Sequence, residues 1–214
     1  CQLFDIHRGD RMRYLVAMDT PSVNGLKLAR EKTGADSFAN GDHTLTLIRT
    51  ERGRVIHLQH NVYTPRPYSR MYSVTGSEGY ASKYPVEGYA FRPAQLSGAG
   101  VPDLENLSEH AFLPDAAREA LMRRYEHPIA AEIAGKAKQV GGHGGMDFIM
   151  DYRLVYCLRH GLPLDQDVYD AAEWSCIGAL TAASLERNSM PVAVPDFTRG
   201  DWNKVDGYRH AMAR

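Results

Sequence analysis

The pattern of apolar and polar positions changes about halfway along the chain. In the first half, short runs of β-branched and aromatic residues are separated by Gly and Pro, which predicts strands joined by turns. Alternating residues at 44–50 and 55–60, with Gly53 in the short loop between them, predict a β-hairpin. The same reasoning predicts a short helix at 23–32 and further strands at 14–18, 71–75, 80–83 and 88–91.

The second half has helical periodicity instead. Helices are predicted at 114–125, 128–140 and 146–159, and a long one from Asp165 or Asp167 to about residue 188. The tail at 191–202 contains prolines and is predicted to lie over the surface. Strands first and helices later, without alternation, predict an α+β fold. We expect a single domain over residues 1–214, in which a mostly antiparallel open sheet has helices packed on one face.

Charge and composition exclude several classes of protein. The 25 Lys and Arg residues nearly balance the 26 Asp and Glu residues, so no overall basic field is present to hold nucleic acid. No apolar run reaches the roughly eighteen residues of a membrane span. The three cysteines are an odd number without CxxC spacing, which predicts buried or free thiols and no structural metal site.

The chain begins at Cys1 and has no initiator Met, which predicts a processed product or a fragment of a longer protein. It carries no GxGxxG after a strand, so the usual mark of a dinucleotide-binding strand, turn and helix is absent. An exported or periplasmic location is expected only if a leader lies upstream of Cys1.

The most unusual stretch of sequence is the glycine-rich segment at 141–147. Four glycines flank His143 directly before a predicted helix, where glycine is costly unless the backbone requires it. His143 is a candidate acid, base or donor, and Asp147 a candidate acceptor for a substrate hydroxyl or a partner that fixes the His143 tautomer. A plain turn between two helices, with Asp147 favouring the helix dipole, is an equally open interpretation.

A second candidate segment is 60–70, where two prolines stiffen the exit from the predicted hairpin. They hold Arg66, Tyr68 and Arg70 in an extended conformation, which suits recognition of a sugar or a phosphate. The alternative is a simple connection with solvated arginines and Tyr68 packed on the sheet.

Two further segments are weaker candidates. The stretch 195–202 mixes aromatic and charged residues, which fits a docking strap or, more simply, packing of Phe197 and Trp202. Four acidic residues near the start of the last helix suggest a cation site but fit helix-start chemistry better: Asp165, Asp167, Asp170 and Glu173.

Five segments together resemble the carboxy-terminal half of glycoside hydrolase family 109, the NAD-dependent α-N-acetylgalactosaminidases of the glucose-fructose oxidoreductase-like superfamily. The resemblance runs from about Ile6 to Trp202, and its motifs occur in the same order. They are 64–70 (TPRPYSR), 143–148 (HGGMDF), 161–165 (GLPLD), 168–175 (VYDAAEWS) and 195–200 (PDFTRG).

The resemblance implies a two-domain parent enzyme. An amino-terminal Rossmann domain, absent from this chain, would bind NAD, while this chain would be the substrate-binding and oligomerisation domain, whose open sheet pairs subunits in a homo-oligomer. The implied substrate is an N-acetylgalactosamine-bearing glycoside. The implied reaction retains configuration through C3 oxidation, C1–C2 elimination, water addition and re-reduction.

The resemblance also assigns site residues. Tyr68 in the Pro-Arg-Pro-Tyr motif is the expected sugar contact, with His143 and Asp147 near it and Arg66 as a further candidate. Catalytic groups are expected upstream of Cys1, so the chain alone is predicted to be inactive. Two alternatives stay open: an NAD(P)-dependent sugar oxidoreductase of the same superfamily, which would release NADH, and a non-catalytic carbohydrate-binding or assembly module.

Overall fold

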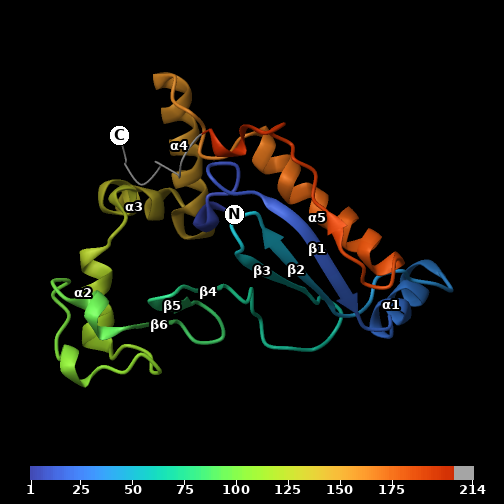
Figure 1. The fold of residues 1–214 in the computed structure, drawn as a ribbon, viewed down its shortest axis with the longest axis horizontal. Coiled ribbons are helices and arrows are strands. Elements are labelled where there is room, and N and C mark those ends of the chain that lie inside the picture. Colours follow the sequence, from blue (N-terminus) through green and yellow to red (C-terminus); the bar gives the residue numbers. More distant parts are fainter. Residues whose placement is uncertain (205–214) are drawn as a thin grey trace. The chain divides into compact units, whose positions relative to one another are not determined.

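The computed structural model describes residues 1–204, which group into two compact units. The first unit contains residues 1–65 and 150–204, and the second contains residues 66–149. Each unit has its own antiparallel sheet and its own cluster of buried apolar side chains. Figure 1 shows the elements of both, coloured along the chain.

The first unit is built on a four-stranded sheet. The strands lie in the order β3, β2, β1, β7, and each is antiparallel to its neighbour. Gly53 turns the β2–β3 hairpin with a φ of +86°, a conformation that favours glycine. The predicted hairpin is therefore confirmed. The strand bounds are β1 (Met12–Asp19), β2 (Thr44–Thr50), β3 (Val55–His60) and β7 (Val192–Ala193).

Helix α5 (Val168–Glu186) covers one face of this sheet. The Thr46 hydroxyl of β2 lies 3.1 Å from that of Thr181, and the Ala17 amide of β1 donates to Ser184 Oγ. Figure 1 shows α5 running alongside β1. The covered face buries Leu15 and Ile48 completely. The other helices with residues in this unit are α1 (Asn24–Thr33) and α4 (Met146–His160), the latter beginning in the second unit.

The start of α5 is fixed by a capping box. The Asp167 carboxylate accepts from the amides of Tyr169 and Asp170, and the Asp170 carboxylate accepts in return from the Asp167 amide at 2.9 Å. These bonds satisfy amides that the first turn of a helix leaves without partners. Of the two predicted helix starts, the structure selects Asp167.

The second unit combines a small sheet with helices. Strands β4 (Ser73–Thr75), β5 (Gly79–Ser82) and β6 (Gly88–Phe91) form an antiparallel meander. Leu96, Leu113 and Leu121 are buried in its apolar cluster. Its α-helices are α2 (Asp115–Arg124) and α3 (Pro128–Val140). Short 3₁₀ helices occur in both units: η1 (Gln2–Phe4), η2 (Pro93–Leu96), η3 (Leu104–Asn106), η4 (His143–Gly145) and η5 (Asp201–Asn203).

The predicted α+β class with open antiparallel strands is confirmed, but the strands form two sheets. The break falls in the segment that follows β3, where Pro65 and Pro67 lack the N–H needed for a sheet ladder. That residues 1–214 act as one domain stays a prediction. Within residues 1–204, no helix has the combined length and apolar character that crossing a membrane requires.

The prediction for the tail was wrong in part. Val192 and Ala193 form β7 at the edge of β1, and Val192 and Val194 are buried in the core of the first unit. The prolines at 191 and 195 flank this short strand and do not interrupt it. Pairing with β1 gives the backbone groups of β7 their hydrogen-bond partners on that side. Val192 and Val194 alternate with Ala193, so both valine side chains lie on the buried face.

Candidate functional site

Tyr68 lies on the irregular connection between β3 and β4. Prolines at 65 and 67 restrict the backbone on both sides of Arg66, and none of residues 61–72 belongs to a helix or strand. The Tyr68 side chain is 70% exposed, and Arg66 is exposed two residues earlier. The alternative interpretation is therefore right about a connection with exposed arginines and wrong about Tyr68, which does not pack on the sheet. That the Tyr68 ring contacts a sugar stays a prediction.

The Tyr68 hydroxyl is held by a neighbour in the same segment. Arg70 Nε donates to Tyr68 Oη at 2.6 Å, and the Tyr84 ring meets the Tyr68 ring edge to face at 5.8 Å between centroids. The hydrogen bond to Tyr68 raises the pKa of the Arg70 guanidinium above its ordinary value. Because Oη accepts this bond, its own hydrogen remains able to donate to a hydroxyl or carbonyl oxygen.

His143 and Asp147 form a pair at the junction of α3 and α4. His143 Nδ1 lies 2.9 Å and 3.2 Å from the two carboxylate oxygens of Asp147. An ionised Asp147 carboxylate only accepts, so the hydrogen of this contact lies on Nδ1 of His143. The His143 side chain is 74% exposed. That Asp147 fixes one His143 tautomer stays a prediction, for which this contact supplies the geometry.

The glycines around this pair are required by the backbone. A Cβ at Gly142 would lie 2.9 Å from Asp147 Oδ2, and one at Gly145 would lie 2.7 Å from the carbonyl carbon of Ala137. Both residues have positive φ, as does His143 itself at +46°. The turn interpretation thus accounts for the glycines, and a strained His143 beside a carboxylate remains a candidate for chemistry.

All four predicted site residues lie in the second unit, in two groups. Within residues 66–149, the recorded contacts of Tyr68 are with Arg70 and Tyr84, and that of His143 is with Asp147. The two groups come from segments more than seventy residues apart in the sequence. That Tyr68, His143 and Asp147 line one pocket stays a prediction.

The acidic residues near α5 bind side chains and amides of the protein. Asp165 accepts two bonds from Arg153 at 2.8 and 2.9 Å, and Asp167 caps the helix. Among residues 1–204, no cluster of three or more His, Cys, Asp or Glu side chains is arranged to hold a metal ion. Helix-start chemistry is confirmed for Asp167 and Asp170.

A buried charge network at the start of α5 escaped the sequence analysis. Arg8 donates to both carboxylate oxygens of Asp170 at 3.0 Å, and His7 Nε2 lies 3.1 Å from Glu173 Oε2. Asp170 and Glu173 are each only 1% exposed. Their spacing of three places both carboxylates on one helix face, which is the one signal of the network that the sequence contains.

Residues 195–202 belong to the first unit and form a turn that is closed by hydrogen bonds to Asp196. The Asp196 carboxylate accepts from Thr198 and from the Gly200 amide, and these bonds, against the effect of burial, hold its pKa below the ordinary value. The Arg11 guanidinium lies 5.7 Å from the Trp202 ring centroid. Packing on this unit is therefore the observed role of Trp202.

The described residues contain no dinucleotide site of the Rossmann type. Such a site needs a parallel strand, a glycine turn and a helix N-terminus in succession. Among residues 1–204, every pairing between the named strands is antiparallel, and the glycine-rich segment joins two helices.

Comparison with known proteins gives consistent matches over the whole chain. A model described as glycosyl hydrolase 109, C-terminal domain, matches residues 1–204. The chain is 62% identical over 216 residues to glycosyl hydrolase family 109 protein 1 of Phocaeicola vulgatus, which covers 100% of the chain and 46% of that relative. It is 59% identical over 215 residues to a glycosyl hydrolase family 109 protein of Porphyromonas gingivalis, with the same coverage of 100% and 46%. The chain thus spans less than half the length of these curated relatives.

Proposed function

The chain belongs to glycosyl hydrolase family 109, and from that premise we propose that it forms the substrate-binding half of a retaining, NAD-dependent glycosidase. The proposed substrate is an α-N-acetylgalactosaminide. Because the described residues contain no dinucleotide site of the Rossmann type, we assign NAD and the catalytic acid and base to the remainder of the longer protein. When bound, NAD would supply the oxidation and re-reduction of the sugar.

The observation that carries this proposal is the presentation of Tyr68. Its ring is exposed on a segment stiffened by two prolines, and Arg70 fixes its oxygen at 2.6 Å. An aromatic face can stack on the apolar side of a pyranose while the phenol donates to a sugar oxygen. Arg66 would add a charged donor on the same segment.

His143 and Asp147 would act as a polar pair on the same sugar. With Nδ1 held by Asp147, the His143 Nε2 atom would form the hydrogen bond to a sugar hydroxyl. In this proposal the pair positions the substrate and does not itself break the glycosidic bond.

We expect Tyr68→Phe in the longer protein to reduce kcat/KM for an aryl α-N-acetylgalactosaminide about tenfold, since one hydrogen bond to the substrate is lost. The measurement is steady-state hydrolysis with NAD present. Tyr72→Phe is the matched control, because Tyr72 is 63% exposed four residues along the chain, and its kcat/KM should stay at the wild-type value.

Unchanged kcat/KM and affinity in Tyr68→Phe would remove Tyr68 from the substrate site. Net accumulation of NADH with free sugar would identify a sugar oxidoreductase and overturn the glycosidase assignment. Sugar binding without turnover by the longer protein, even with NAD added, would indicate a binding module. The present chain alone is expected to show no hydrolysis.

We also propose that the open face of the four-stranded sheet pairs two subunits. This face lies opposite α5 and carries apolar side chains that are 38–67% exposed, at Met18, Leu45, Leu47 and Val55. The strand register places Arg49 and His57 on this face as well, so the face is apolar with a polar part, and exposed apolar side chains on a strand surface are typical of an interaction site. A second copy supplies the same apolar surface, as a two-fold interface requires.

We expect Leu47→Lys to convert a dimer of the longer protein to a monomer, because a buried charge without a partner opposes association. Light scattering coupled to size exclusion measures the mass. Val86→Lys is the control, since Val86 is 54% exposed in a loop of the second unit. A mass that Leu47→Lys leaves unchanged would contradict the proposed interface.

A further inference from the structure

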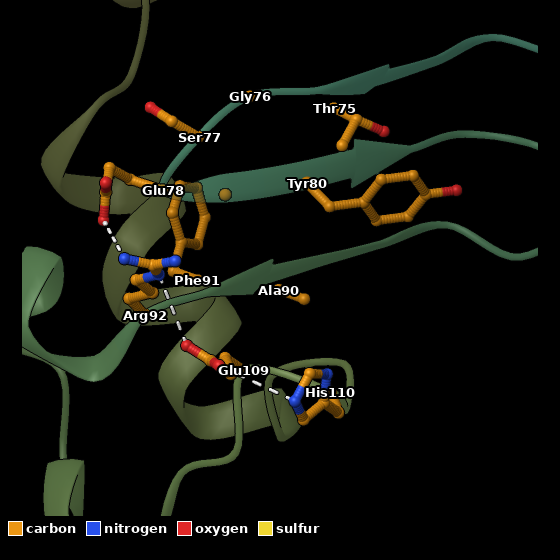
Figure 2. Close-up of a pocket in the computed structure, with 11 residues that line it drawn as sticks. Thr75, Gly76, Ser77, Glu78, Tyr80, Ala90, Phe91, Arg92, Glu109 and His110 are labelled. Atoms are coloured by element: carbon orange, nitrogen blue, oxygen red, sulfur yellow. Dashed lines mark ion pairs between the residues drawn. The ribbon is translucent and has the colours of Figure 1, made fainter.

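The second unit contains a hollow that none of the predicted site residues lines. It has a volume of about 190 Å³ and lies between the β4–β5 turn, the end of β6 and the loop around Glu109. The hollow is open to solvent, so it can take one sugar ring that is either free or part of a longer chain. Figure 2 shows Glu78, Phe91, Arg92 and Glu109 close together, while the Tyr80 side chain points away from this group.

The hollow has an aromatic side. The ring of Phe91 in β6 packs directly on Gly79 of β5, so closely that a Cβ atom at position 79 would collide with it. Tyr80 lines the hollow next to Gly79, and its ring centroid lies 6.2 Å from that of Phe112. The missing side chain at Gly79 thus gives Phe91 a fixed position, so its ring offers an apolar surface for the C–H groups of a sugar.

Beside Phe91 lies a chain of exposed charged groups centred on Arg92 (Figure 2). Its guanidinium lies 3.7 Å from a Glu78 oxygen and 3.4 Å from a Glu109 oxygen, and His110 lies 3.6 Å from the other Glu109 oxygen. These separations exceed those of good charge-assisted hydrogen bonds. The groups therefore offset each other's charge while keeping donors and acceptors that a ligand can use.

The balance of charge indicates the class of ligand. Two carboxylates and one guanidinium give this group a net negative charge, which opposes phosphate or carboxylate ligands, and Arg92 already lies where a cation would pair with both carboxylates. A neutral ligand with several hydroxyl groups can donate to Glu78 and Glu109 and accept from Arg92. We propose that this hollow binds a neutral sugar ring, stacked on Phe91 and held through its hydroxyls by Arg92 and the two glutamates.

This site is separate from the proposed glycosidase site. It shares no residue with Tyr68, Arg66, His143 or Asp147, so either proposal can fail while the other stands. The bound sugar ring is either a free monosaccharide or one unit of a longer glycan. Both present the same ring hydroxyls to the hollow, but a glycan has further sugar units outside it.

The test is a nuclear magnetic resonance titration of the ¹⁵N-labelled 214-residue chain. Methyl α-N-acetylgalactosaminide and methyl α-galactoside are expected to shift the amide signals of Gly76, Gly79 and Arg92, with a Kd on the order of 1 mM. A neutral trisaccharide forms the second arm. Equal Kd values would identify a single ring as the ligand, and a tighter trisaccharide would identify a glycan.

Arg92→Ala is expected to raise the Kd about tenfold or more, because the central donor is lost. Arg123→Ala is the matched control, since Arg123 is also paired to a glutamate on the surface of this unit and should leave the Kd unchanged. Glu109→Gln, which keeps the side-chain shape, replaces Arg92→Ala if that variant does not fold, and the same rise in Kd is expected. Absence of shifts up to about 100 mM sugar, wild-type Kd in the folded variant, or equal shifts with inorganic phosphate would overturn the proposal.

Discussion

Replacing Asp170 by alanine is expected to destabilise the first unit by about 2–3 kcal/mol, because the buried Arg8 guanidinium loses a carboxylate that accepts two of its hydrogen bonds and keeps the partly exposed Asp167 carboxylate at 3.2 Å. The Asp170 side chain is 1% exposed, and Arg8 donates to both of its oxygens at 3.0 Å. The change also removes the acceptor for the Asp167 amide, so the capping box at the start of α5 is lost.

Urea unfolding followed by tryptophan fluorescence measures this loss. Both tryptophans of the chain, Trp174 and Trp202, lie in the first unit, so the signal reports on that unit. Asp201→Ala is the matched control, because Asp201 pairs with Lys204 where both side chains are at least 60% exposed. We expect the control to change the free energy of unfolding by less than about 0.5 kcal/mol.

A double variant separates the net contribution of the Arg8–Asp170 pair to the free energy of unfolding from the cost of removing one partner alone. Arg8→Met combined with Asp170→Leu replaces both charges by apolar groups, and we expect it to be more stable than Asp170→Ala alone. A loss below about 1 kcal/mol in Asp170→Ala would show that water or another group solvates Arg8. The buried pair would then contribute little to the fold.

The same residue predicts a pH dependence. Burial alone would raise the pKa of Asp170, but hydrogen bonds from Arg8 and the Asp167 amide hold that pKa below the ordinary value. A carboxyl with a lowered folded pKa stabilises the fold above its unfolded pKa of about 3.9, and this stability is lost as the pH falls through the folded pKa. The wild type should therefore lose more stability below about pH 4 than Asp170→Ala does, and parallel curves would contradict this.

The local elements were largely predictable because their signals are local. Alternation defines β2 and β3, and the capping residue Asp167 defines the start of α5. The division of the strands into two sheets was not predicted, because sheet membership depends on long-range pairing. The two prolines after β3 were nevertheless visible in the sequence, and they mark the break.

The burial of the charged network is the other feature that local reasoning missed. Asp170 and Glu173 look like ordinary acidic residues near a helix start, and His7 and Arg8 lie more than 150 positions earlier. Only the packing of the first residues against α5 brings them together. For Tyr68, the prolines beside it predicted a stiffened connection, but the sequence left open whether the ring packs on the sheet, and the structure has the residue 70% exposed.

The glycine-rich junction gives the second large prediction, in a series of three alanine substitutions. Gly145→Ala should cost about 3 kcal/mol or more, since its φ is +99° and its Cβ would meet the Ala137 backbone at 2.7 Å. Gly144→Ala, with a φ of +73° and open space around it, should cost about 1 kcal/mol. Gly135→Ala inside α3, also in open space, should stabilise by about 0.5–1 kcal/mol.

Thermal unfolding and amide exchange across α3 and the start of α4 measure the stability cost of each substitution. The order of the three costs separates the two reasons for glycine in this segment, which are a positive φ and a close backbone contact. Equal effects of Gly144→Ala and Gly145→Ala would mean that backbone strain alone matters and that the contact with Ala137 relaxes freely. If the predicted order holds, the close approach of α3 to the junction is what fixes the backbone beside His143. In that case Gly145→Ala should also increase exchange at the Asp147 amide, which bonds to the Gly142 carbonyl, because displacing the turn breaks this bond and the His143–Asp147 pair together.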